Sequence, residues 1–315
     1  MSDSVLEEVI IKTLENNDKA ANFIWHGGEP LICGLDFFKK IVEFQKKHNT
    51  KNLAIYNTVQ TNALMLDKNF VNFFKDNNFD IGTSLDGPFY IHRAGRNTSQ
   101  AQYDTIINNL KYATKNYRVS SICVVTPDSL GHEQEIFDTL MNTGIKKIVF
   151  YPLNDDDATK AIDPKLYGEF LINMFNIWIH SGIRGINIRE FREFLMWKNN
   201  LPLRLCCVTD CCKHYYSVTY DGSVYPCDLF KSVDEVKLGT VFDSADYLNE
   251  RSAEFYKNSN IIYDQCKDCE YLDFCKCGCR YYRYMNSKDF SKPSYFCESF
   301  KMLYPEIEKA LQLYS

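Results

Sequence analysis

The chain has 315 residues and a formal net charge of −5 at pH 7. This length allows one large domain and a smaller one, and 45% hydrophobic residues are enough to fill a core. The acidic balance argues against nucleic acid as a partner, because phosphate binding needs a basic face. No apolar run approaches the roughly 18 residues of a membrane span, and residues 1–20 lack the regions of a signal peptide. We therefore expect a cytoplasmic protein with no membrane partner, whose cysteines lie in a reducing compartment.

Apolar residues between positions 1 and 150 recur alternately at helical and at strand spacing. The expected helices span 5–14, 35–48, 70–75, 103–114 and 133–142, and the expected strands span 22–25, 53–58, 79–85, 119–125 and 146–151. A sixth strand is indicated at 185–188, between further helices at 163–181 and 189–198. Strands that alternate with helices of this length predict βαβ units and a parallel sheet.

The pattern changes after about residue 200. Residues 215–220 and 223–225 flank Asp221-Gly222, which predicts a hairpin. We expect the rest of this part to be rich in loops and cross-linked through its cysteines, with a closing helix at 294–313. The predicted domains are therefore residues 1–200 and 201–315.

Eleven of the thirteen cysteines follow residue 205. Eight of them are regularly spaced: Cys206, Cys212 and Cys227, then Cys266-x2-Cys269-x5-Cys275-x3-Cys279, and last Cys297. Two sets of four thiolates suit two iron–sulfur clusters, but structural zinc uses similar tetrads. A disulfide framework would need export, for which the sequence has no signal. The cysteines outside the pattern are Cys33, Cys123, Cys207, Cys211 and Cys277.

Three polar motifs follow the first three expected strands. Gly27-Gly28-Glu29-Pro30 combines two glycines, which let a backbone approach a ligand, with a carboxylate that can receive an ammonium. Gln60-Thr61-Asn62 and Ser84-Leu85-Asp86-Gly87-Pro88 end the next two strands, where turn and cap chemistry is the ordinary explanation. Because active sites of parallel sheets collect at the carboxyl ends of the strands, we expect the three motifs to converge.

The cysteine pattern, with Gly222 five residues before Cys227, resembles the SPASM domain of radical S-adenosylmethionine (SAM) enzymes. The additional Cys206 makes it most similar to the anaerobic sulfatase-maturating enzymes. The resemblance implies a partial (β/α)6 barrel followed by a SPASM domain with two auxiliary 4Fe–4S clusters. It assigns Cys206, Cys212, Cys227 and Cys279 to the first cluster and Cys266, Cys269, Cys275 and Cys297 to the second.

The same resemblance implies a SAM site in the first half of the chain. It is made by Gly27, Gly28, Glu29, Pro30, Gln60, Asn62, Ser84 and Asp86. Asp228 matches the catalytic base, although an exposed loop carboxylate is the usual fate of an aspartate. His26 stands where the family carries Gln, and we expect it to face the pocket. Arg93 and Arg96 are positioned to bind a carboxylate or to lie in a solvated loop.

One family motif does not occur in this sequence. Radical SAM enzymes hold the cluster that cleaves SAM on CxxxCxxC after a first strand, and these 315 residues contain no such motif. We expect the first barrel strand and this third 4Fe–4S cluster only on a segment that precedes Met1. The retained Glu29, Ser84 and Asp228 favour a sequence record that begins late over a natural protein that binds peptide without radical chemistry.

The resemblance implies oxidation of a Cys or Ser side chain of a sulfatase to formylglycine. The implied partners are a sulfatase polypeptide or peptide and an electron donor such as ferredoxin or flavodoxin. Two alternatives remain open. One is a maturase of ribosomal peptides that forms thioether or carbon–carbon crosslinks, and the other is a non-catalytic, cluster-bearing protein that binds peptide.

Overall fold

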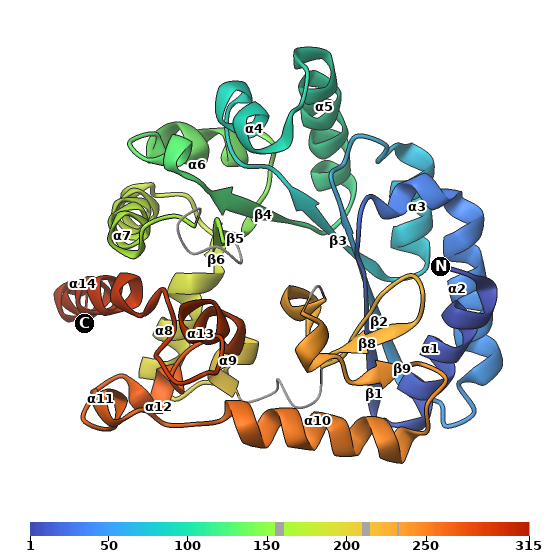
Figure 1. Cartoon of the computed structure of the whole chain (residues 1–315). Helices are drawn as coiled ribbons and strands as arrows, with labels where there is room; N and C mark the ends of the chain where they lie inside the picture. The colour runs from blue at the N-terminus through green and yellow to red at the C-terminus, as the bar shows by residue number, and fades with distance from the viewer. Residues whose placement is uncertain (155–160, 210–214, 232, 315) are drawn as a thin grey trace. The chain divides into compact units, whose positions relative to one another are not determined.

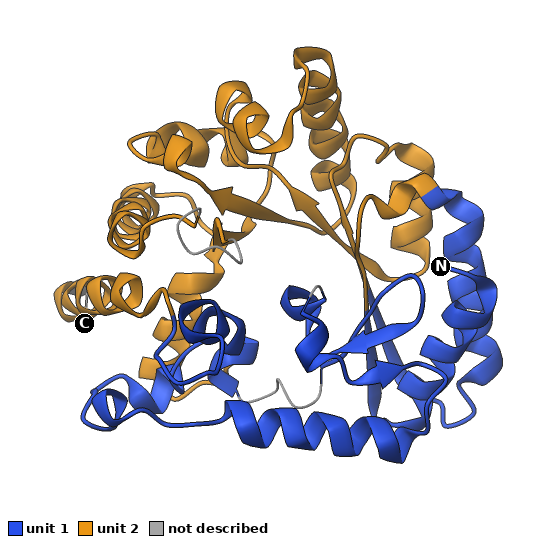
Figure 2. Ribbon diagram, viewed as in Figure 1, with its two compact units in different colours: residues 1–23, 33–57, 204–294 blue, residues 24–32, 58–203, 295–315 orange. Residues whose placement is uncertain are grey.

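The computed structural model describes residues 1–154, 161–209, 215–231 and 233–314 (Figure 1). The chain divides into two compact units, each built from several segments (Figure 2). Unit 1 comprises residues 1–23, 33–57 and 204–294, and unit 2 comprises residues 24–32, 58–203 and 295–315. One passage between the units falls at Leu203 and Arg204. The division into domains 1–200 and 201–315 stays a prediction.

A six-stranded parallel sheet has its strands in chain order, from β1 to β6. The strands are β1 (Ala20–Trp25), β2 (Ala54–Thr61), β3 (Phe79–Ser84), β4 (Val119–Val125), β5 (Lys147–Pro152) and β6 (Asn187–Ile188). Strands β1 and β2 each pass from unit 1 to unit 2 along their length. The sheet confirms the expected α/β fold class, and the indicated sixth strand is present as the short β6.

The helices of unit 2 follow its strands and cover one face of the sheet (Figure 1). They are η1 (Pro30–Cys33), whose last residue belongs to unit 1, α3 (Lys68–Asp76), α4 (Phe89–Arg96), α5 (Gln100–Asn116), η2 (Pro127–Ser129), α6 (Glu133–Asn142), α7 (Pro164–His180), α8 (Arg189–Lys198) and α14 (Cys297–Tyr314). Local sequence explains where two of these helices begin. Ser99 and Gln102 form a capping box at α5, and Asp163 caps α7 before its first-turn Pro164.

Residues of the sheet alternate between a covered and an open face. In β5, Ile148, Phe150 and Pro152 are buried, and the Phe150 ring packs on Phe170 of α7 with centroids 5.4 Å apart. The intervening Val149 and Tyr151 remain partly exposed. This period of two puts the apolar residues under the helices and leaves the other, inner face of the sheet accessible.

Unit 1 combines two N-terminal helices with the cysteine-rich part of the chain. Its elements outside the main sheet are α1 (Asp3–Glu15), α2 (Gly34–His48), α9 (Cys206–Thr209), β7 (Ser217–Val218), β8 (Ser223–Tyr225), η4 (Asp228–Phe230), η5 (Asp234–Val236), β9 (Gly239–Thr240), α10 (Ala245–Ser259), α11 (Asp264–Lys267), α12 (Leu272–Cys275) and α13 (Arg280–Ser287). Strands β7, β8 and β9 form an antiparallel sheet, which confirms the predicted hairpin. Val5 of α1 shares a buried cluster with Val224 and Leu248.

Among the described residues, three helices of eight residues or more were not expected from the sequence. Helices α4, α10 and α13 occupy stretches predicted as loop, and the prediction is wrong there. Helix α10 buries only Leu248, Ser252 and Ser259 over 15 residues, so it lacks the apolar stripe that identifies a surface helix. Within the described ranges, no helix is both long and apolar enough to cross a membrane.

Candidate functional site

The turn after β1 is organised by the carboxylate of Glu29. Its Oε1 accepts hydrogen bonds from the backbone N–H of Leu31 at 3.1 Å and from the hydroxyl of Thr61 at 2.6 Å. Its Oε2 accepts one from the backbone N–H of Asn62 at 2.7 Å. A carboxylate has about four acceptor positions, so three are used and one remains. Glu29 therefore joins the ends of β1 and β2, as expected for converging motifs.

The two glycines before Glu29 leave open space above their backbone. Gly27 and Gly28 have φ angles of +111° and +52°, and an added Cβ at either would meet no atom within 4 Å. Glycine is the residue that adopts these angles without strain. Pro30 begins η1 and is buried. The turn thus offers backbone and one carboxylate position to a ligand, which fits a group that carries an ammonium.

The motif after β2 continues this network toward β3. The Gln60 amide donates to the carbonyl of Thr83 at 2.8 Å and to the hydroxyl of Ser84 at 3.3 Å. The space above Gly82 is filled by Gln60, whose Oε1 lies 2.2 Å from where an added Cβ would stand. The Asn62 side chain accepts from the backbone of Leu64, an ordinary turn contact. Gln60 and Ser84 are therefore brought together, while Asn62 contributes chiefly its backbone.

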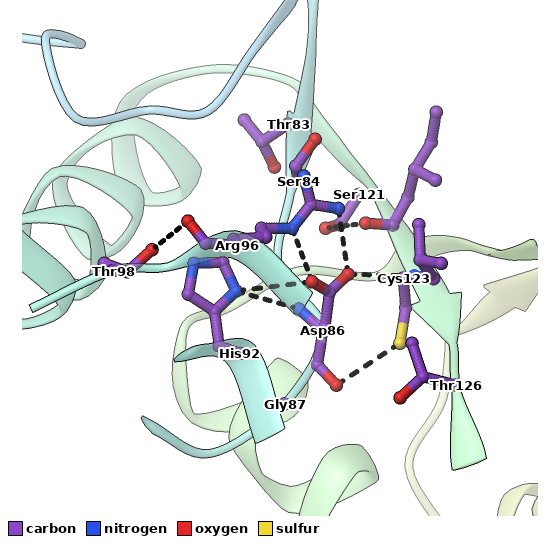
Figure 3. A network of polar contacts seen from close by, with 12 residues as sticks. Thr83, Ser84, Asp86, Gly87, His92, Arg96, Thr98, Ser121, Cys123 and Thr126 are labelled. Carbon is purple, nitrogen blue, oxygen red and sulfur yellow. Dashed lines mark hydrogen bonds and ion pairs between the residues drawn. The ribbon is translucent and has the colours of Figure 1, made fainter. Parts of the chain in front are cut away.

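Asp86 lies at the centre of the third motif (Figure 3). Both oxygens accept from the guanidinium of Arg96: Nε pairs with Oδ2, and Nη2 with Oδ1 at 2.9 Å. Oδ1 also accepts from the backbone N–H of Val124 in β4, at 2.8 Å. The hydrogen bonds and charge of Asp86 outweigh the effect of burial and raise the pKa of Arg96. Asp86 therefore holds the side chain of Arg96 in place, and this side chain remains 25% exposed.

His92 and Cys123 complete the surroundings of Asp86 and were not singled out as site residues. His92 Nδ1 accepts from the backbone N–H of Asp86 at 3.3 Å, and its buried Nε2 has no hydrogen-bond partner. Burial lowers the pKa of His92 to about 4, against the opposing charge of Asp86. The Cys123 thiol donates to the carbonyl of Asp86, and burial raises its pKa well above the ordinary value. Cys123 lies 37 positions from Asp86, so no local signal reveals its contact, whereas His92 is only six residues from Asp86.

The site therefore consists of an open glycine turn, an anchored carboxylate, a serine and an anchored arginine at the carboxyl ends of β1 to β3. Figure 3 shows Ser84 and Arg96 close to Asp86 on adjacent elements. A carboxylate beside a guanidinium can bind the ammonium and carboxylate of one α-amino acid group. The sequence alone did not show that Arg96, rather than Arg93, is anchored. Arg93 is exposed and lies 6.0 Å from the Phe89 ring, and His26 is exposed.

Comparison with known proteins identifies the family. A cysteine-type anaerobic sulfatase-maturating enzyme of Clostridium perfringens is 33% identical over 322 residues, covering 96% of this chain and 85% of the relative. The chain belongs to the anaerobic sulfatase-maturating enzymes of the radical SAM family. A serine-type relative from Bacteroides thetaiotaomicron is 26% identical and covers 98% of this chain and 81% of its own length. No protein-family model matches the chain.

Solved structures agree with this assignment. The structure titled "Native anSMEcpe with bound AdoMet and Kp18Cys peptide" has a TM-score of 0.88 and 31% identity, and the match covers 99% of this chain and 90% of that one. AdoMet is SAM, so the relative binds the cofactor expected from the resemblance. Streptococcus suis SuiB bound to its precursor peptide SuiA, at 14% identity and a TM-score of 0.60, shares the fold alone.

The cysteines of the pattern lie mostly in unit 1. Helix α9, which begins at Cys206, packs against α12, which ends at Cys275, so one member of each predicted set lies on adjoining helices. Cys212 lies outside the described residues, and Cys297 begins α14 in unit 2. Across the described ranges, no three His, Cys, Asp or Glu side chains form a group that would hold one metal ion. Thiolate donors suit iron–sulfur chemistry, and the division into two sets stays a prediction.

Asp228 follows Cys227 and begins η4 in unit 1. Its side chain is half-exposed and accepts from the ammonium of Lys231 at 3.3 Å. This is an ion pair between neighbouring residues on a short helix, and it is compatible with either a surface carboxylate or a base that a substrate reaches. The role of Asp228 stays a prediction.

Proposed function

We propose that this chain takes part in the oxidation of a Cys or Ser side chain of a sulfatase to formylglycine. Membership of the sulfatase-maturating family supports a maturation enzyme in general. The observation that carries the proposal is the set of hydrogen bonds that joins Glu29 to Asn62, Gln60 to Ser84 and Arg96 to Asp86, in the motifs that follow β1 to β3. This arrangement suits the amino acid part of SAM, and SAM is bound in structures of a relative 31% identical to this chain.

In this proposal the residues of unit 2 bind and orient the cofactor. Glu29 receives the ammonium at its remaining acceptor position, while the glycine turn brings backbone atoms close. Asp86 holds Arg96 in place. The remaining N–H groups of Arg96 face the SAM carboxylate, whose charge is balanced by the ammonium of the same ligand. When bound and reductively cleaved, SAM would supply the radical chemistry that removes a hydrogen atom from the substrate Cβ.

Asp228 accepts the proton that leaves the substrate thiol or hydroxyl. This gives the aldehyde directly from Ser and a thioaldehyde from Cys, which water converts to the aldehyde with release of sulfide. The assigned cysteines would hold two auxiliary 4Fe–4S clusters, which supply a place for the released electron. A sulfatase segment is the proposed partner, in keeping with the peptide in a relative's structure title. A small reductant such as ferredoxin or flavodoxin is proposed as the electron donor.

The test measures the aldehyde product by mass spectrometry, after anaerobic reconstitution with iron and sulfide and incubation with SAM, dithionite and a sulfatase-type peptide. Because these 315 residues contain no CxxxCxxC motif, the assay compares them with the same reading frame including any upstream codons that encode it. We expect product only from the longer chain. No SAM cleavage by that chain would contradict the enzyme proposal, and cleavage by the 315 residues alone would contradict the expected location of the third cluster.

The role of Asp228 is tested in the same assay with Asp228→Asn. The matched control is Asp36→Asn, since Asp36 pairs with Lys39 at the same spacing of three residues but lies on α2. We expect the first variant to lose formylglycine while it still cleaves SAM, and the control to keep both activities. A crosslinked peptide instead of an aldehyde would favour the ribosomal-peptide maturase.

A further inference from the structure

An arginine lies on the inner face of the sheet, away from the SAM-type motifs. Arg189 directly follows β6, whose Ile188 pairs with Ile148 of β5. Its guanidinium carbon lies 5.0 Å from the centre of the Tyr151 ring. Because Phe150 points toward α7, strand alternation puts Tyr151 on the opposite face. Arg189 and Tyr151 therefore meet on the face that the outer helices leave open.

The guanidinium of Arg189 is held by the next residue in the chain. Glu190 Oε1 accepts from Nε of Arg189 at 3.0 Å and from Nη2 at 2.6 Å. Glu190 Oε2 accepts from the backbone N–H of Phe150 at 3.2 Å, which ties the carboxylate to β5. Burial acts to lower the pKa of Arg189, but the charges of Glu190 and Tyr151 and the hydrogen bonds to Glu190 together raise that pKa. The arginine is thus fixed in orientation before any ligand arrives.

The donors of Arg189 are only partly used. An arginine carries five N–H groups, and Glu190 accepts from Nε and Nη2. Within the described ranges no residue accepts from Nη1, and the arginine side chain is 27% exposed while that of Glu190 is 3% exposed. A rigid donor beside an aromatic ring on an accessible concave face is suited to ligand binding, because little entropy is lost when the bond forms.

The charge balance indicates which acceptor fits. Glu190 already neutralises Arg189, so a ligand carboxylate would arrive without a counter-charge in a partly desolvated place. A neutral carbonyl oxygen carries no such cost, and the Tyr151 ring offers apolar area beside it. We propose that Arg189 and Tyr151 form a subsite that binds a main-chain carbonyl of the extended substrate peptide. This proposal rests on the proposed function, since it assumes a peptide substrate.

The chain contains a matched control for Arg189. Helix α8 repeats the sequence Arg-Glu-Phe, and Arg192 pairs with Glu193 through Nη1 at 3.1 Å. The side chains of this second pair are 27% and 2% exposed, as in the first pair. Arg192 lies one helical turn beyond β6, however, and no ring contact to Tyr151 accompanies it. The two arginines have equally exposed side chains and each pairs with the following glutamate, Arg189 through two N–H groups and Arg192 through one.

The experiment measures peptide affinity without turnover. The reconstituted chain is titrated with a fluorescein-labelled synthetic sulfatase-type peptide, and binding is followed by fluorescence anisotropy. Arg189→Ala should weaken peptide binding by about tenfold or more, the size expected for a hydrogen bond to a charged group. Arg192→Ala should leave the affinity unchanged, and neither variant should change the affinity for SAM. Arg189→Lys, which keeps the charge but not the fork, provides a second variant if the alanine chain does not fold.

A set of peptides with single amide-to-ester replacements identifies the carbonyl. An ester carbonyl is a weaker acceptor, so one position should weaken binding to the unaltered chain but not to the Arg189 variants. Equal affinities of the Arg189 variants and the unaltered chain, or the absence of such a position, would overturn the subsite. A loss of SAM affinity alone would also overturn it, by assigning Arg189 to the cofactor. No peptide binding by the unaltered chain would overturn the proposed function itself, and the subsite with it.

Discussion

The carboxyl edge of the sheet in unit 2 and the cysteine-rich segment of unit 1 are stabilised in different ways. At the sheet edge, polar groups satisfy one another, as Asp86 does with Arg96 and Val124, above a core of aromatic side chains. The segment 264–287 instead contains helices of four, four and eight residues. Helices this short are not stable alone, because nucleating a helix costs more free energy than its few hydrogen bonds contribute.

The same contrast appears when one arginine of each region is compared. Arg96 has a carboxylate partner, whereas Arg283 in unit 1 is 2% exposed and donates to the carbonyls of Ser259, Phe290 and Lys292. No carboxylate pairs with Arg283 among the described residues, and burial lowers its pKa. From this comparison we expect that packing and ion pairing stabilise the sheet edge, while the cysteine-rich segment depends on what its thiolates bind. Four predictions test this difference.

The largest effect is expected from removing one proposed cluster ligand. Cys266→Ser should lower the bound iron by about half, because each cluster needs four thiolates. Hydrogen exchange should then accelerate across residues 264–287 and remain slow in β3 and β4, since ligation stabilises only the cysteine-rich part. Cys33→Ser, at an exposed cysteine outside the pattern, is the control. Unchanged iron in the Cys266 variant would contradict its assignment as a ligand.

Breaking the ion pair at the sheet edge should have the next largest effect. Asp86→Asn leaves Arg96 without its counter-charge, so the free energy of unfolding should fall by about 3 kcal/mol in urea denaturation. Asp80→Asn is the control, because Asp80 pairs with Arg118 at 2.9 Å with both side chains about half-exposed. Exposed pairs contribute about 1 kcal/mol or less. Equal losses in the two variants would show that burial does not distinguish these pairs.

The buried His92 should make stability depend on pH. Its pKa of about 4 lies below the unfolded value of 6.5, so only the unfolded chain takes up a proton between those values. The stabilisation is therefore complete above about pH 6.5 and is lost as the pH falls toward 4, with a total of about 3 kcal/mol. His92→Phe should reduce the slope of unfolding free energy over this window. An unchanged slope in this variant would contradict the role of His92.

The smallest effects are expected at helix caps in both units. Asp67 accepts from two backbone N–H groups of α3, and Ser244 accepts from one of α10. Loss of such a cap lowers the free energy of unfolding by about 1 kcal/mol. We expect Asp67→Ala to show this loss whether or not clusters are bound. We expect Ser244→Ala to show it only after the metal is removed, because ligation stabilises unit 1. A loss from Ser244→Ala with clusters bound would mean that local helix stability also limits unit 1.

Much of the fold could be predicted from the sequence, because its signals are local. Alternating residues in 119–125 and apolar residues at helical spacing in 133–142 gave the bounds of β4 and α6 without error. Helix α10 was missed because its few buried residues do not form a clear stripe, and α13 because two of the five residues it buries are arginines. The cysteine spacing led to the family, and the structure adds only that α9 and α12 adjoin.

The sequence by itself determined the strand–helix alternation, the family and the three polar motifs at the strand ends, because each depends on residue types at short spacing. Tertiary structure alone decided what those side chains contact. Glu29 accepts hydrogen bonds from Thr61 and Asn62, and Asp86 forms an ion pair with Arg96. The tertiary structure also brings Arg189 to the ring of Tyr151, 38 positions earlier in the chain. Such pairings depend on strand register and helix packing over long distances in sequence, and no local pattern encodes them.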